Sequence, residues 1–102
     1  MKITEHLGNA KKTLFSFEIL PPLKGQSLKE LLEGISPLMD FKPPFVDVTY
    51  HREEYIYKKH PNGLLEKIST KKRPGTVGIC AAIMNRFHID AVPHLLCGGF
   101  TK

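Results

Sequence analysis

The alternation of short apolar segments with stretches of helical periodicity is the feature that most constrains this chain. Three segments are apolar, aromatic or β-branched in the manner of buried strands, at residues 13–20, 45–50 and 90–97. Segments with helical spacing lie between them. Because strands that alternate with helices form parallel sheets joined by right-handed crossovers, the sequence predicts an α/β fold.

Two crossover helices are expected. Ser27 and Glu30 form an S-x-x-E capping box, and the apolar residues after it recur at helical spacing as far as Met39. The second helix is expected from Thr76, with an apolar face formed by Val77, Cys80, Ala81, Met84 and Phe87. Shorter helices are also predicted within residues 1–12 and around residues 64–68.

Three strands and two helices form only part of a closed architecture. A (β/α)8 barrel takes about 250 residues, whereas this chain has 102. A parallel sheet also needs cover on both faces. We therefore expect the first three βα units of a (β/α)8 TIM barrel, incomplete in this chain, with residues 1–102 as the amino-terminal part of one domain.

Composition excludes several classes of protein. No apolar run approaches the roughly 18 residues of a membrane span, and the first residues lack the pattern of a secretion signal, so a cytoplasmic protein is expected. Two cysteines do not make a disulfide framework, and the histidines show no metal-ligand spacing, so no metal site is predicted. No glycine-rich phosphate-binding motif is present.

Most of the positive charge lies in one segment. Residues 51–74 carry +4 of the formal net charge of +5 and form a basic insertion between the second strand and the second helix. Such a segment is either a solvated surface or a contact for phosphates. The alternative reading of the whole chain is a non-catalytic basic module that binds nucleic acid or an acidic partner. The aromatic residues lie mostly in the strands and not among the lysines and arginines, which disfavours binding to nucleic acid.

Polar residues near the ends of the three strands are the candidate site residues. Glu18 lies in an apolar strand, Thr49 ends the next one, and His94 lies late in the third. Because parallel strands end at the same edge of a sheet, these groups should converge where α/β enzymes place their chemistry. Apolar surroundings would raise the pKa of Glu18 and make it a general acid. The alternative is a solvated carboxylate, or one paired with Lys24.

Thr49, Tyr50 and His94 also allow two readings. Thr49 and Tyr50 are good strand formers, and a lone histidine is often a structural hydrogen-bonding group. Their position at the carboxyl ends of the strands favours a part in binding instead.

Three motifs in the correct order resemble the methylenetetrahydrofolate reductase family. Phe17–Pro22 (FEILPP) resembles the family's F-E-F-F-P-P signature, and Val46–Tyr50 (VDVTY) is similar to its V-x-V-T-Y strand. Ala91–Cys97 (AVPHLLC) resembles its A-x-P-H-L-T-C strand. The three motifs span most of the chain.

The resemblance implies a flavin-binding TIM-barrel reductase. Such an enzyme passes a hydride from NADH or NADPH through FAD to methylenetetrahydrofolate, which gives 5-methyltetrahydrofolate for methionine synthesis. By position in the motifs, Glu18 matches the acid that protonates the folate. Thr49, Tyr50 and His94 match flavin-site positions, and Arg52 occupies a place where the family contacts FAD, although the residue type differs. A homo-oligomer is also implied, with no partner in nucleic acid or membrane.

The chain departs from the family at several positions. Residues 51–54 replace glycine and small residues, Leu96 replaces a threonine, and residues 55–73 have no counterpart in the motifs. The family's later L-R-G-D loop lies beyond Lys102. We therefore expect the 102 residues alone to be inactive and colourless.

Overall fold

A three-stranded parallel sheet forms the centre of the molecule. The computed structural model describes residues 1–23, 25–50, 55–69 and 75–97. Its main sheet has the order β1-β2-β5, with strands β1 (Phe17–Ile19), β2 (Phe45–Val48) and β5 (Asp90–Pro93). Both pairings are parallel. The predicted strand–helix–strand–helix–strand order is therefore confirmed, although each strand is shorter than the apolar segment that contains it.

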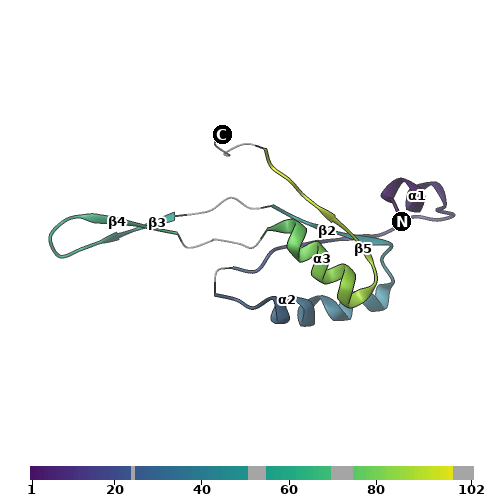
Figure 1. The fold of residues 1–102 in the computed structure, drawn as a ribbon, viewed down its shortest axis with the longest axis horizontal. Helices are drawn as coiled ribbons and strands as arrows, with labels where there is room; N and C mark the ends of the chain where they lie inside the picture. The colour runs from purple at the N-terminus through teal and green to yellow at the C-terminus, as the bar shows by residue number, and fades with distance from the viewer. Residues whose placement is uncertain (24, 51–54, 70–74, 98–102) are drawn as a thin grey trace.

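Two helical crossovers cover one face of this sheet (Figure 1). The first crossover contains α2 (Leu28–Ile35) and the 3-10 helix η1 (Ser36–Phe41), and the second contains α3 (Thr76–Phe87). Their apolar sides and the strands enclose a core formed by Ile19, Ile35, Val46, Val48, Ile79, Cys80 and Ile83. In β2 the two valines are fully buried and Asp47 alternates with them. One face of β2 therefore packs on the helices, and Asp47 lies on the other face.

The helix of the first crossover is shorter than its apolar pattern predicts. Ser27 caps α2 as expected, because its hydroxyl accepts a hydrogen bond from the Glu30 amide at 3.1 Å. The helix then changes to η1 at Ser36, with Pro37 in the first turn. Proline has no amide hydrogen for an α-helical bond, so it favours this break. The expectation of a single helix as far as Met39 is corrected accordingly.

α3 buries a face that overlaps only in part with the predicted one. Cys80 is buried and Phe87 packs against the core, as predicted. Val77 is 60% exposed and Met84 44% exposed, whereas Ile79 and Ile83 are buried. The helix is apolar on most sides, so periodicity alone did not fix which side faces the sheet. The β-branched residues Ile79 and Ile83 pack there together with Cys80.

The basic insertion contains an antiparallel hairpin instead of the predicted short helix. Strands β3 (Tyr55–Lys59) and β4 (Leu65–Ser69) pair along their whole lengths. The turn between them closes with a hydrogen bond from the Gly63 amide to the His60 carbonyl at 2.9 Å. Gly63 has a φ of +82°, a conformation that favours glycine. The residues around Leu65 and Ile68 were wrongly predicted as helical because the turn and the pairing with β3 outweigh their helical spacing.

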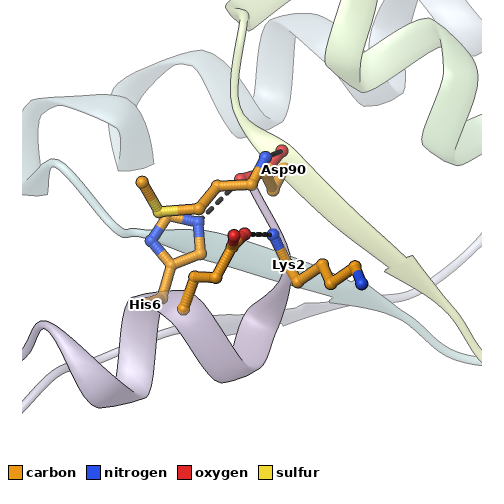
Figure 2. A network of polar contacts seen from close by, with 5 residues as sticks. Lys2, His6 and Asp90 are labelled. Atoms are coloured by element: carbon orange, nitrogen blue, oxygen red, sulfur yellow. Dashed lines mark hydrogen bonds and ion pairs between the residues drawn. The ribbon is translucent and has the colours of Figure 1, made fainter.

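The amino-terminal helix α1 (Ile3–Gly8) contacts the sheet at its amino edge. His6 Nε2 lies 2.6 Å from Asp90 Oδ2 at the start of β5, and the Met1 ammonium lies 3.2 Å from Oδ1 (Figure 2). The His6 ring also lies against Phe45, with ring centroids 6.0 Å apart. α1 is therefore fixed at the end of the sheet opposite to the candidate site. In the part of the chain that the structure describes, no helix is both long and apolar enough to cross a membrane.

Candidate functional site

Thr49 and His94 lie at the carboxyl ends of adjacent parallel strands. Val48 and Pro93 are register partners, so Thr49 and His94 are the next residues along β2 and β5. The Thr49 amide donates to the carbonyl of Ile19 at 3.0 Å, and the His94 amide donates to that of Val48 at 2.9 Å. The sheet hydrogen bonds thus continue through both residues, and the backbone holds them side by side.

Glu18 shares this open face of the sheet. It is in register with Asp47, which is in register with Val92. Since partners in register lie on the same face and residues two apart lie on the same face, Glu18 joins Asp47, Thr49 and His94 on the side away from α2 and α3. The three groups predicted to converge therefore belong to one face at the carboxyl half of one sheet.

Glu18 is exposed, in contrast to the apolar enclosure expected from its strand. Its neighbours Phe17 and Ile19 direct their side chains to the helical side, where Ile19 is only 5% exposed. The Glu18 carboxylate lies on the opposite face of the strand, so Phe17 and Ile19 do not enclose it. Lys24, the alternative partner for Glu18, lies outside the described residues. The open face leaves Glu18 accessible to a bound molecule.

The backbone amide and the backbone carbonyl of His94 both form hydrogen bonds. Its carbonyl accepts a hydrogen bond from the hydroxyl of Thr76 at 2.8 Å, and its amide bonds to β2 as described above. Thr76 is 3% exposed and begins α3. A buried hydroxyl must find a partner, so Thr76 fixes the chain after β5 against the start of the helix. Sequence reasoning missed Thr76, which carried no signal beyond its place at the start of a helix.

Asp47 is the second residue that sequence reasoning missed. Its Oδ1 lies 3.9 Å from His94 Nε2, and its side chain is 23% exposed. Burial raises the pKa of the Cys80 thiol, and the negative charge of Asp47 raises that pKa further. A carboxylate between two valines of a strand gives the same signal as Glu18 between Phe17 and Ile19, so the argument made for Glu18 could have found it.

Of the remaining candidates, the structure describes Thr49 and Tyr50 but not Arg52. Thr49 is half-buried, and its hydroxyl donates to the Ile19 carbonyl at 3.4 Å. Tyr50 is also half-buried and follows directly. Arg52 lies outside the described residues. Among the residues that the structure describes, no group of three or more histidine, cysteine or carboxylate side chains could hold a metal ion.

Comparison with known proteins identifies the family. The family model described as methylenetetrahydrofolate reductase matches residues 2–102. This chain belongs to the methylenetetrahydrofolate reductase family. No curated protein and no solved structure matches the chain.

Methylenetetrahydrofolate reductases are folate-related oxidoreductases of one-carbon metabolism, with a TIM-barrel fold and a general dependence on flavin. The parallel α/β sheet described above agrees with that fold class. The family match covers the three motifs, including Glu18, Thr49 and His94.

Proposed function

We propose that this chain forms the first three βα units of a (β/α)8 reductase that carries FAD. In this proposal the enzyme reduces 5,10-methylenetetrahydrofolate to 5-methyltetrahydrofolate with NADH or NADPH as the hydride donor, in the cytoplasm. The observation that carries the proposal is the convergence of Glu18, Thr49 and His94 on one face of a parallel sheet in a chain that the reductase family model matches.

Glu18 is proposed as the proton donor to the folate. Its carboxyl group lies on the open face, two residues before the level of Thr49, so a ligand lying across the strand ends would reach it. A general acid must come within hydrogen-bonding distance of the atom it protonates. An exposed carboxyl on a rigid strand meets that requirement once the ligand covers it.

Thr49, Tyr50 and His94 are proposed to bind the flavin, together with Arg52, which follows Tyr50 by two residues in the sequence. A hydroxyl and an imidazole side by side at two strand ends supply donors and acceptors suited to the polar edge of a flavin ring or to its ribityl chain. The flavin, when bound, supplies the hydride chemistry. The protein residues orient the ring and hold it against the open face of the sheet.

The experiment separates the two half-reactions in the longest form of the protein that retains flavin. Under anaerobic conditions, NADH or NADPH reduces the flavin, and methylenetetrahydrofolate then reoxidises it. Glu18→Gln should slow reoxidation by about 10²-fold or more, the usual contribution of a general acid. Reduction by the nicotinamide should stay near the wild-type rate, because that step needs no proton on the folate.

Glu33→Gln is the matched control, because it removes an exposed carboxylate from the helical side of the sheet. It should leave both half-reactions unchanged. Equal reoxidation rates in Glu18→Gln and wild type would refute the acid role. We further expect the 102-residue chain alone to be colourless, and flavin absorbance at a stoichiometric level would contradict the proposal that more of the barrel is needed.

A further inference from the structure

Three ionisable side chains lie in a row across the open face of the sheet. Glu18 in β1 is the register partner of Asp47 in β2, and Asp47 Oδ1 lies 3.9 Å from His94 Nε2, directly after the end of β5. Val92, the partner of Asp47 in β5, is apolar. Asp47 is therefore the middle member of the row, with a carboxyl group on one side and an imidazole on the other.

The spacing of the row makes the charges of its members interdependent. Adjacent strands lie about 4.8 Å apart, so the side chains of Glu18 and Asp47 leave the same face as close neighbours. Two carboxylates in that position repel each other when both are ionised. An imidazolium at His94 would attract whichever carboxylate is ionised, and Asp47 is the one within 4 Å of it.

We propose that Asp47 keeps a proton on Glu18 when flavin and folate cover the open face. This inference rests on the proposed function, because it concerns the state of the acid in that reaction. Asp47 acts in two ways that have the same sign: it holds the positive charge of His94, and it repels a negative charge on Glu18. It is a positioning residue, since it places the proton without giving it to the folate.

Cover by a ligand is what makes this arrangement effective. In the open sheet, water surrounds the exposed Glu18 carboxylate and screens it. When a ligand excludes that water, the interactions with Asp47 and His94 become stronger, and an unpaired charge becomes costly. The favoured state of the row is then an imidazolium, a carboxylate and a neutral carboxyl group, with no net charge. A pair of carboxyl groups with only one proton is a common way to keep an acid protonated near neutral pH.

The other titratable groups near the row do not replace Asp47 in this role. Asp90 shares the open face at the amino edge, where His6 and the amino terminus pair with it. The Cys80 thiol on α3 is neutral, because burial and the charge of Asp47 both raise its pKa. Lys24 and Arg52 lie outside the described residues. Within the part of the chain that the structure describes, Asp47 and His94 therefore set the charge around Glu18.

Asp47→Asn tests the proposal, because it removes the charge and keeps the shape of the side chain. The protein is the longest form that retains flavin, oxidised and with methylenetetrahydrofolate bound, so that no turnover occurs. Infrared difference spectroscopy follows the carbonyl stretch of a protonated carboxyl group, and its loss in Glu18→Gln assigns the band to Glu18. We expect this band near pH 7 in the wild type. Its titration midpoint should fall by about one pH unit in Asp47→Asn.

The rate of flavin reoxidation by the folate supplies a second readout. The rate should decrease with rising pH around the same midpoint as the infrared band, because only the protonated acid reacts. In Asp47→Asn this midpoint should move to lower pH by the same amount, and the plateau rate at low pH should stay near the wild-type value. A merely structural defect would lower the plateau and leave the midpoint in place.

Asp40→Asn is the matched control, because it makes the same exchange at an exposed carboxylate of η1, on the helical side of the sheet. It should leave the midpoint and the plateau unchanged. A wild type with no Glu18 band near pH 7, or an unmoved midpoint in Asp47→Asn, would overturn the proposal. Failure of the proposed acid role is a different result, in which Glu18→Gln reoxidises the flavin as fast as the wild type. The infrared band reports the proton on Glu18 in either case.

Discussion

Replacement of Ile83 by alanine tests the packing of α3 against the sheet. Ile83 is fully buried at the centre of the core, between the second crossover helix and the strands. Ile83→Ala removes three carbon atoms from this site. At about 0.8 kcal/mol per buried methylene, the lost transfer free energy is about 2.4 kcal/mol. The cavity left behind adds to this, so we expect a total loss of about 3–4 kcal/mol in the free energy of unfolding.

Urea denaturation followed by circular dichroism measures this loss. With an m-value of about 2 kcal/mol/M, the midpoint should fall by about 1.5–2 M. Val77→Ala is the control on the same helix, because Val77 is 60% exposed, and its effect should stay within about 0.5 kcal/mol. If the two variants lost the same stability, or Val77→Ala lost more, the assignment of the buried face of α3 would be wrong.

Three further predictions concern single side chains. The hydrogen bond from His6, assisted by the amino terminus, lowers the pKa of Asp90. The ionised Asp90 carboxylate therefore stabilises the fold fully above about pH 4, and this stabilisation is lost as the pH falls through the lowered pKa. In urea unfolding, Asp90→Asn should destabilise the protein less at pH 3 than at pH 6. Gly78→Ala should raise the free energy of unfolding by about 0.5–1 kcal/mol in the same assay, because an added Cβ meets nothing within 4 Å on an exposed helical position. Iodoacetamide at pH 8 should modify exposed Cys97 and spare Cys80, whose pKa is raised by burial; mass spectrometry should find the second adduct only after addition of urea, and equal labelling in the native protein would contradict the burial.

The sequence was sufficient to predict the parallel sheet but not the secondary structure of the insertion. The three apolar segments are short and bounded by proline or glycine, which is typical of buried strands. The segments between them have helical spacing, so the alternation of strands and helices could be predicted. In the insertion, by contrast, Leu64, Leu65 and Ile68 fit helical spacing, while Ile56 and Ile68 meet only through pairing across a turn. Cross-strand pairing is non-local, so inspection of residues 64–68 alone could not reveal it.

The positions of the candidate site residues were predictable for the same reason as the sheet. Once three strands are known to be parallel and in sequence order, their ends must lie at one edge, and the motif residues follow. The contacts between those residues were not predictable. The hydrogen bond from Thr76 to the His94 carbonyl and the approach of Asp47 to the His94 ring depend on how α3 and β5 meet β2 in three dimensions.

The exposure of Glu18 changes the physical argument for its proposed role. The sequence reasoning placed the acid in an apolar setting provided by its own strand, but alternation sends Phe17 and Ile19 to the helical side and Glu18 to the open face. If the side chains of this segment enclosed Glu18, they would also keep a folate ring away from its carboxyl group. The position of Glu18 is therefore set by β1. Under the proposed function, its dry environment comes from what covers the open face, namely the flavin, the folate and the remainder of the barrel. Mutations in the core of this segment should accordingly affect stability, whereas changes in the groups that cover the open face should affect proton transfer.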